Sequence, residues 1–274
     1  MAFLPHVVAV GAETATVDVL VLHGILGSGR NLRTFAQRLA VVHPQLRLWL
    51  VDLRNHGDSQ GAPPPHTIAA CCADLDALCA ARKLRPAWVI GHSYGGKVAV
   101  AWAGTAPAGL QRLWVLDSPP AGYTMAQDAD GDAADNVERV IATLREIPMP
   151  LANRRDVVGA FTQRGFPESI GQWMTTNVRQ AADGYRWVFD LDAIDAMLVS
   201  YLATDTWPIL ESPPPGIRID VIRAERSRRW PPDVLARFAA IPHDQTRLHL
   251  LPNAGHWLHV ERTEALVALM TSLL

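Results

Sequence analysis

A serine lies between two glycines in the segment Gly91-His92-Ser93-Tyr94-Gly95. This segment directly follows the apolar run Ala87–Ile90 and precedes the helical segment Lys97–Ala103. In such a strand–turn–helix the turn is so tight that the serine takes a strained backbone conformation, and side chains at the two glycine positions would collide. The hydroxyl then lies at a helix N-terminus, where backbone dipoles favour developing negative charge. We therefore predict that Ser93 is a nucleophile rather than a serine in an ordinary turn.

Two histidines near the end of the chain could take the proton of that serine. A serine hydroxyl is a poor nucleophile until a base removes its proton. The apolar run Thr246–Leu251 is followed by Pro-Asn-Ala-Gly-His256-Trp-Leu-His259, so both candidates come after a predicted strand. We favour His256 as the base because it directly follows the glycine turn, in the loop where the last member of a nucleophile–acid–base order is expected. His259 is expected to begin the final helix.

These residues need a scaffold, and the rest of the chain predicts a parallel sheet. Six short runs are almost continuously apolar, which is typical of strands covered on both faces. Between them lie stretches with the i, i+3, i+4, i+7 spacing of helices. This alternation indicates an α/β fold with a doubly wound, mostly parallel sheet, to which His6–Val10 adds an antiparallel strand. The six predicted strands are Val17–Leu22, Leu46–Val51, Ala87–Ile90, Leu110–Leu116, Ile217–Ile222 and Thr246–Leu251.

One long interval breaks this alternation. Between Pro119 and about Thr206 no buried strand is predicted, and the interval is too long for a simple crossover between strands. We interpret residues 120–205 as a helical cap, or lid, inserted into a core formed by residues 1–119 and 206–274. The predicted cap helices are Val137–Arg145, Asp156–Gln163, Ile170–Val178 and Leu191–Leu202.

Five segments spread over nearly the whole chain carry a family resemblance. They are His23–Asn31, Asp52–Ser59, Gly91–Lys97, Trp187–Leu191 and Ala254–His259. With these segments the sequence resembles the α/β-hydrolase superfamily, and in particular the short esterases of the YbfF type. The resemblance implies the α/β-hydrolase fold and serine-dependent hydrolysis of acyl esters. Where this family usually has methionine the chain has Tyr94, a departure that bears on the shape of the pocket rather than on the reaction.

The resemblance also bears on the acid that orients the base. Most α/β-hydrolases place this acid after the strand that is here Ile217–Ile222, but the expected position holds Ser227, and Glu225 lies two residues too early. The YbfF-type esterases take the acid from the end of the preceding strand, which is here Asp117. A carboxylate at this edge of the sheet can hold the imidazole Nδ1–H and stabilise the imidazolium. We favour Asp117 as the acid, keep Glu225 as the alternative, and note that Asp117 could instead cap a turn.

The strand–turn–helix at Ser93 and the loop after Val17–Leu22 predict the two donors of an oxyanion hole. One is the backbone N–H of Tyr94, the residue after the nucleophile. The other is the backbone N–H of Ile25, in the loop after Val17–Leu22, where Gly24 lets the chain turn. We interpret His23 as a structural residue of this loop and not as a base.

Candidates for substrate contact come from the predicted cap and from an arginine-rich segment. Large apolar side chains of the cap could line a pocket, although such residues more often pack between helices. Four arginines follow the strand Ile217–Ile222, where Arg226 and Arg229 could attract a coenzyme A phosphate or a carboxylate-bearing acyl chain. A solvated arginine-rich loop is the other interpretation. The cap candidates are Phe161, Phe166, Trp173, Met174, Trp187 and Met197, and the arginines are Arg223, Arg226, Arg228 and Arg229.

Composition narrows the classes of function. The 274 residues carry 25 Lys+Arg against 27 Asp+Glu, and a net charge of −2 argues against nucleic acid as the main partner. No apolar run approaches the roughly 18 residues of a membrane span, and the first residues lack the pattern of a signal peptide. We interpret Cys71, Cys72 and Cys79 as small hydrophobes of a protein made in a reducing compartment, and expect it to be cytoplasmic. No zinc-ligand spacing occurs near them, so we expect neither a metal nor an organic cofactor.

Together these residues predict a serine hydrolase that cleaves carboxylic esters or thioesters through an acyl-enzyme on Ser93. The triad would be Ser93, His256 and Asp117, acting on a small acyl ester or thioester, and the oligomeric state is left open. Two alternatives use the same residues. One is a cofactor-free C–C bond hydrolase or perhydrolase, and the other is a slow-turnover ligand receptor with a hydrolase fold.

Overall fold

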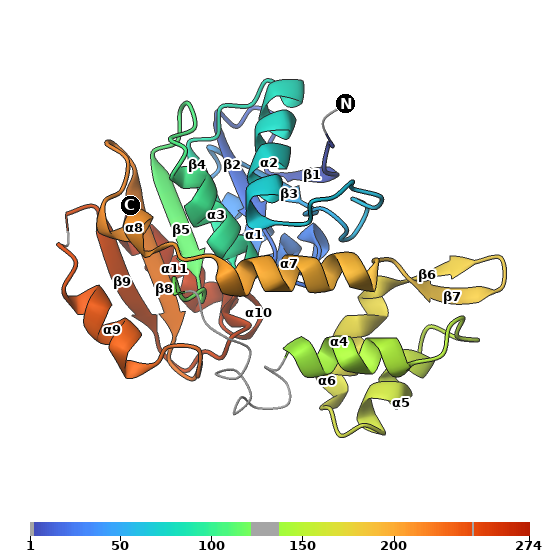
Figure 1. The fold of residues 1–274 in the computed structure, drawn as a ribbon. Coiled ribbons are helices and arrows are strands. Elements are labelled where there is room, and N and C mark those ends of the chain that lie inside the picture. The colour runs from blue at the N-terminus through green and yellow to red at the C-terminus, as the bar shows by residue number, and fades with distance from the viewer. Residues whose placement is uncertain (1–2, 122–136, 243) are drawn as a thin grey trace.

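The computed structural model describes residues 3–121, 137–242 and 244–274, and a seven-stranded sheet lies at its centre (Figure 1). The strands are β1 (Val7–Val10), β2 (Val17–Leu22), β3 (Leu46–Val51), β4 (Trp88–His92), β5 (Arg112–Leu116), β8 (Arg218–Ala224) and β9 (Thr246–Leu251). Their order in the sheet is β1-β3-β2-β4-β5-β8-β9. Only the β1–β3 pair is antiparallel within this described sheet. The predicted α/β class and mostly parallel sheet are confirmed.

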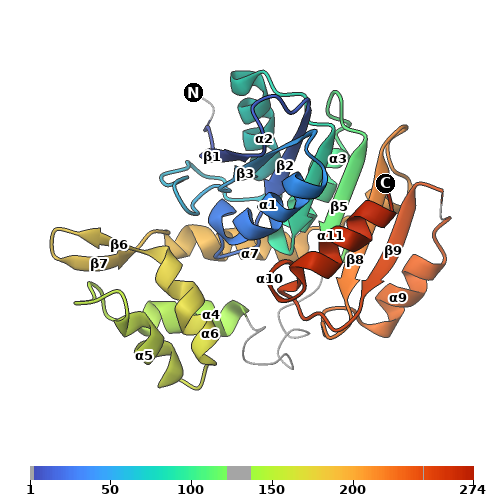
Figure 2. The same ribbon diagram turned by 180° about the vertical axis from the view of Figure 1, so that it is seen from behind.

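Helices cover both faces of the sheet, which explains why its strands are nearly continuous apolar runs. They are α1 (Arg33–Val42, after the 3-10 turn Gly29–Leu32), α2 (Ile68–Arg82), α3 (Tyr94–Ala103), α8 (Trp207–Glu211), α9 (Pro232–Ala239), α10 (Leu258–Glu261) and α11 (Thr263–Ser272). Helices α1 and α11 pack together on one face (Figure 2), whereas α2, α3 and α8 lie on the other. In the described ranges, every helix is too short or too polar to cross a lipid bilayer.

The register of the sheet brings the ends of three central strands together. His92 at the end of β4 pairs with Leu116 of β5, and Leu116 pairs with Ile222 of β8. The next residues along the chain are Ser93 after β4 and Asp117 after β5. The backbone N–H of Ser93 donates to the Leu116 carbonyl (3.0 Å), and that of Asp117 donates to the Ile222 carbonyl (2.8 Å). The predicted nucleophile and the predicted acid therefore leave neighbouring strands at the same edge of the sheet.

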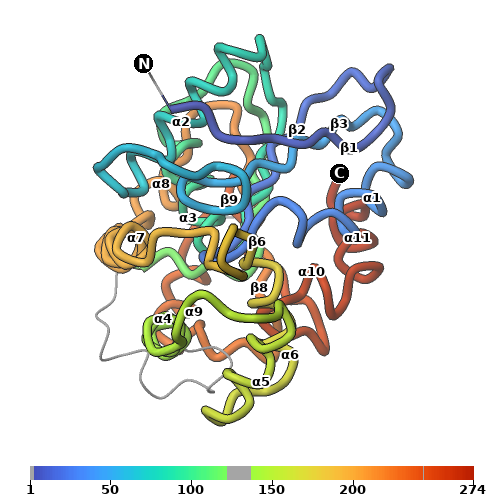
Figure 3. Tube along the Cα trace, turned by 90° about the vertical axis from the view of Figure 1, so that its right-hand side faces the viewer, coloured from blue at the N-terminus to red at the C-terminus, as the bar shows by residue number. Residues whose placement is uncertain are grey.

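Between β5 and β8 the chain forms a further layer beyond this carboxyl edge. It comprises α4 (Val137–Glu146), α5 (Asp156–Thr162), α6 (Glu168–Met174), β6 (Val178–Ala181), β7 (Gly184–Trp187) and α7 (Leu191–Ala203). Helix α7 lies between the sheet-bearing part and the rest of the layer, because it contacts α2 on one side and α4 on the other (Figures 1 and 3). We call these elements the α4–α7 layer. Residues 122–136 at the start of the predicted cap lie outside the described residues.

The β6–β7 hairpin in this layer was not predicted. The predicted helix Ile170–Val178 ends at Met174 and passes through a 3-10 turn, so that Val178 already begins β6. Only Val178 of the four β6 residues is buried, and β7 has no fully buried residue. A strand pair exposed in this way lacks the apolar pattern by which the strands of the main sheet were predicted. Gly184 takes φ +137° where the hairpin turns, a conformation that favours glycine.

Candidate active site

Ser93 occupies a strained turn between β4 and α3. Its backbone has φ +51° and ψ −117°, a conformation that a residue with a side chain adopts only at an energetic cost. A Cβ atom at Gly91 would lie 2.2 Å from the carbonyl oxygen of Gly95, and one at Gly95 would lie 2.5 Å from that of His23. Both positions therefore require glycine. The turn places Ser93 at the N-terminus of α3 and on the wall of two cavities.

His256 lies in the loop between β9 and α10 and is hydrogen-bonded to Asp117. Its Nδ1 lies 2.7 Å from Oδ2 of Asp117, whose side chain is completely buried. Because a carboxylate only accepts, Nδ1 carries the proton and the Nε2 of the neutral ring is left as a proton acceptor. His256 and Ser93 line the same cavity. The structure therefore brings all three predicted triad residues to one place, with the histidine in the tautomer that a general base requires.

Two further residues donate hydrogen bonds to Oδ1 of Asp117 and were not predicted from the sequence. The indole N–H of Trp230 donates to its Oδ1 (2.7 Å), and so does the backbone N–H of Ala224 (3.0 Å). Burial alone would raise the pKa of Asp117, but the imidazole of His256, the Ala224 N–H and the Ser227 hydroxyl outweigh burial and hold this pKa below its usual value. Ser227 was the available sequence signal for this support. It stands where most α/β-hydrolases have the triad acid, and here its hydroxyl donates a hydrogen bond to Asp117.

The loop that carries His256 is held from outside by other residues. Nε2 of His92, the residue before the nucleophile, donates to the carbonyl oxygen of His256 (2.8 Å). Glu225, the alternative acid, is exposed and accepts a hydrogen bond from the backbone N–H of Asn253 (2.7 Å). Glu225 therefore holds the start of this loop. In the described part of the chain, the carboxylate that is hydrogen-bonded to the imidazole of His256 is that of Asp117.

The predicted oxyanion donors both lie beside Ser93. Ile25 and Tyr94 line the smaller cavity at the nucleophile, and neither backbone N–H donates to another group in the described part of the chain. The loop of Ile25 is fixed at Leu26, whose N–H donates to Nε2 of His56 (2.9 Å) and whose carbonyl accepts from Asn177 of the α4–α7 layer (2.8 Å). Both residues thus lie on the wall of a cavity at the nucleophile, as the predicted oxyanion hole requires.

His23 is fully occupied in holding the same loop. Its Nε2 accepts from the backbone N–H of Leu53 (2.9 Å), so its Nδ1 carries the proton and donates to the Gly24 carbonyl (2.7 Å). Burial lowers the pKa of His23 to about 4 and that of His56 to about 3. Both imidazoles are therefore neutral structural groups at neutral pH.

These buried histidines predict a loss of stability in mild acid. In the unfolded chain a histidine takes a proton near pH 6.5, whereas the folded chain resists protonation until the pH nears 4 at His23 and about 3 at His56. Stability is therefore lost as the pH falls below 6.5, by up to about 2 kcal/mol per histidine at about pH 5. Thermal unfolding between about pH 7.5 and 5 should show a falling midpoint. His56→Gln should flatten that dependence and His6→Gln, at an exposed histidine, should not; equal slopes in all three proteins would contradict the prediction.

Two cavities meet at Ser93. The larger has a volume of about 590 Å³ including its open mouth, and the smaller about 340 Å³. An acyl group and an alkoxy group extend in different directions from one carbonyl carbon, so two cavities at one nucleophile suit an ester. Both are lined by Ile25, Ser93, Val137 and Arg229, the larger also by Leu26, Leu32, Val140, Trp173, His256 and Trp257, and the smaller also by Tyr94, Glu138, Leu198, Tyr201 and Leu202.

The residues predicted for substrate contact divide into two groups. Trp173 lines the larger cavity and packs edge-to-face on Trp257, with ring centroids 4.5 Å apart. Trp187 lines neither cavity, because its indole N–H donates to the Leu144 carbonyl (3.3 Å) and its ring stacks on Phe189. Four others are buried in the packing of the α4–α7 layer and line neither cavity; they are Phe161, Phe166, Met174 and Met197.

The predicted arginine cluster is also divided. Arg226 points away from the cavities, because its guanidinium pairs with Glu261 (3.0 Å) and donates to the Asn253 carbonyl (2.9 Å). Arg228 is exposed, and Arg223 lies on β8. Of the four, Arg229 alone lines the described cavities at Ser93.

A buried lysine connects the nucleophile helix to the α4–α7 layer. Nζ of Lys97 on α3 donates to the carbonyl oxygens of Ala121 (3.0 Å), Tyr201 (2.8 Å) and Thr204 (3.0 Å). Ala121 precedes the layer and Thr204 follows it, so one side chain holds both of its connections. Burial lowers the pKa of Lys97 to about 7.

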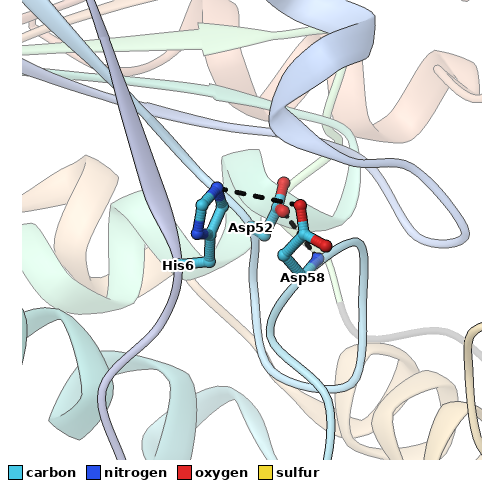
Figure 4. A group of neighbouring side chains, drawn as sticks. All are labelled: His6, Asp52 and Asp58. Carbon is cyan, nitrogen blue, oxygen red and sulfur yellow. Dashed lines mark hydrogen bonds and ion pairs between the residues drawn. The ribbon is translucent and has the colours of Figure 1, made fainter.

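One group of side chains outside the cavities has the composition of a metal site. Ligand atoms of His6, Asp52 and Asp58 lie within 4.8 Å of one another (Figure 4). The Asp52 carboxylate accepts from the backbone N–H of Asp58 (2.8 Å), and the Asp58 carboxylate pairs with Arg30 (3.6 Å) and with Arg179 of β6. Two guanidinium groups at one carboxylate occupy the place of a cation, so we interpret this group as a contact between the β6–β7 hairpin and the sheet-bearing part.

Comparison with known proteins places the chain in a family. Residues 19–263 match the alpha/beta hydrolase fold family, and the chain belongs to that family. It is 29% identical over 266 residues to the sn-1-specific diacylglycerol lipase ABHD11 of Mus musculus, covering 95% of this chain and 82% of the mouse protein. It is 25% identical over 253 residues to the esterase YbfF of Escherichia coli strain K12, covering 91% and 89%. The predicted resemblance to YbfF-type esterases is confirmed.

A solved structure shares the fold over the full length. A marine microorganism esterase superposes with a TM-score of 0.85 at 23% sequence identity, covering 99% of this chain and 100% of that one. At this identity the likeness shows the fold alone, and it confirms the α/β-hydrolase fold.

Proposed function

We propose that Ser93, His256 and Asp117 act as a catalytic triad in ester hydrolysis. Oγ of Ser93 bonds to the ester carbonyl carbon while its proton passes to Nε2 of His256. The N–H groups of Ile25 and Tyr94 hold the oxyanion, the bond to the alkoxy oxygen breaks, and that oxygen leaves with the proton as an alcohol. Water then attacks the acyl-enzyme and gives one proton to His256. Ser93 takes this proton back as the carboxylic acid departs, and Asp117 stays ionised throughout.

The chain is a carboxylic ester hydrolase of the α/β-hydrolase family. The observation that carries the proposed triad is the 2.7 Å hydrogen bond between Nδ1 of His256 and buried Asp117, because it fixes the tautomer whose Nε2 can accept the Ser93 proton. The strained turn at Ser93 supports the same assignment, since strain of this kind gathers at functional positions.

We also propose that residues 120–205 form a cap over the site and that thioesters are substrates besides oxygen esters. The cap is supported by Val137, Val140 and Trp173, which belong to this segment and line the larger cavity. Thioesters are supported by chemistry, because the same oxyanion and base serve an acyl carbon with either leaving atom. A cytoplasmic location is supported by the free cysteines Cys71, Cys72 and Cys79.

Covalent trapping tests the proposed mechanism directly. p-Nitrophenyl diethyl phosphate should phosphorylate Ser93 with loss of p-nitrophenol, and peptide mapping should find the diethyl phosphate on this residue. In parallel, p-nitrophenyl esters of increasing chain length and matched thioesters should be turned over at a steady rate. A label on another residue would contradict the assignment of the nucleophile. A single burst of p-nitrophenol without steady release would instead indicate a ligand receptor.

A further inference from the structure

Arg229 is the feature of the site that ester hydrolysis itself does not explain. It lies in the loop between β8 and α9 and lines both cavities together with Ser93. Hydrolysis of a neutral ester needs a nucleophile, a base and oxyanion donors, all of which other residues supply. An arginine on the walls of both cavities at the nucleophile therefore calls for a role in selecting the substrate.

The loop that carries Arg229 is held firmly to the catalytic residues. The backbone N–H of Arg226 donates to the Ala254 carbonyl (2.9 Å), and that of Ser227 donates to the Ala224 carbonyl (3.2 Å). Directly after Arg229, buried Trp230 donates its indole N–H to Asp117. The backbone is thus held on both sides of Arg229 by contacts that include the one that supports the acid, and Arg229 lies on the cavity walls that it shares with Ser93.

The charge of Arg229 stands out against the lining of the larger cavity. Among the described lining residues of that cavity, Arg229 is the single member of the Arg, Lys, Asp and Glu types. In the smaller cavity the carboxylate of Glu138 joins it. Cavity walls of low dielectric strengthen the field of such a charge.

We propose that Arg229 binds an anionic group of the substrate, so that the preferred esters carry a carboxylate within a few bonds of the scissile carbonyl. This inference rests on the proposed function of Ser93. A planar guanidinium offers five N–H donors in a fork that matches a carboxylate, so it can donate to a substrate in addition to its contacts within the protein. The carboxylate belongs either to the acyl chain, as in half-esters of short dicarboxylic acids, or to the leaving group.

Matched pairs of esters test this inference. For the acyl side the pair is p-nitrophenyl hemisuccinate and p-nitrophenyl pentanoate, and for the leaving-group side it is 4-carboxyphenyl butanoate and 4-methylphenyl butanoate. Arg229→Met should lower kcat/KM for the anionic member of one pair about 10- to 100-fold, the loss of a charged hydrogen-bonded contact, and change the neutral member little. Arg229→Lys should restore part of the loss. The pair that responds identifies the side that carries the carboxylate.

The controls separate this inference from the proposed function. Arg82→Met, at an exposed arginine in the last turn of α2, should leave all four values unchanged. With the wild-type protein alone, added salt should lower kcat/KM for the preferred anionic ester and not for its neutral partner. Equal effects of Arg229→Met on anionic and neutral esters, or no selective effect of salt, would overturn the role of Arg229 while leaving ester hydrolysis intact. Failure to hydrolyse any of the four esters would overturn the proposed function itself.

Discussion

Replacing Ser93 by alanine should lower kcat for p-nitrophenyl ester hydrolysis by about 10⁴-fold or more. The hydroxyl is the atom that forms the acyl-enzyme, and no neighbouring group in the described site can form the same bond from the same strained turn. Removing one oxygen atom changes the packing around position 93 little. The circular dichroism spectrum and the thermal midpoint of Ser93→Ala should therefore match those of the wild type. Steady-state kinetics with a chromogenic short-chain ester measure the effect.

The matched control is Ser212→Ala, at an exposed serine after α8. It should leave kcat unchanged, because its side chain belongs to neither cavity. If Ser93→Ala keeps a kcat within about tenfold of the wild type, the reaction does not pass through an acyl-enzyme on Ser93, and the proposed mechanism is wrong.

Replacing Asp117 by asparagine should cost about 10⁴-fold in kcat, although the side chain keeps its shape. The Oδ1 atom accepts from Ala224 and Trp230, so the amide oxygen of asparagine should take that place. The amide N–H₂ then faces Nδ1 of His256 as a donor, which forces the imidazole into the tautomer with the proton on Nε2. In this tautomer His256 cannot accept the proton of Ser93. The pH dependence of kcat, measured beside its magnitude, reports the loss of the base.

Glu225→Gln provides the comparison that decides between the two candidate acids. Glutamine keeps an oxygen that can accept from the backbone N–H of Asn253, so the loop that carries His256 should keep its position. We expect a change in kcat of about threefold or less, typical of an exposed neutral substitution. A larger loss in Glu225→Gln than in Asp117→Asn would reassign the acid.

Much of the fold could be predicted because its signals are local in the sequence. Buried parallel strands such as Val17–Leu22 read as apolar runs, and the glycines around Ser93 mark a turn that no other residue type permits. Right-handed crossovers between parallel strands then restrict most of the topology of the sheet. Local patterns failed at the β6–β7 hairpin, where both strands are largely exposed and neither has an apolar run.

Contacts between distant segments could not be predicted in this way. Trp173 and Trp187 are the same residue type and were predicted together, yet Trp173 meets Trp257 on a cavity wall and Trp187 packs inside the α4–α7 layer. Arg226 and Arg229 are three residues apart and were predicted together. Glu261, which lies 35 residues further along the chain, pairs with Arg226 and removes it from the site. Such choices depend on tertiary partners that periodicity does not reveal.

The three described acceptors of Lys97 bear on which residues of this protein can be substituted during evolution. All are main-chain carbonyls, which every amino acid possesses, so substitutions at Ala121 or Thr204 leave these hydrogen bonds in place, whereas the ring centroid of Tyr201 also lies 4.2 Å from Nζ of Lys97. The side chains of that layer line the cavities and set what fits beside Ser93. Mutation can therefore alter substrate preference at many positions of the layer, while the Lys97 side chain on the nucleophile helix keeps the layer attached beside Ser93. We expect new specificities in this architecture to arise from substitutions in the layer, with Lys97 retained.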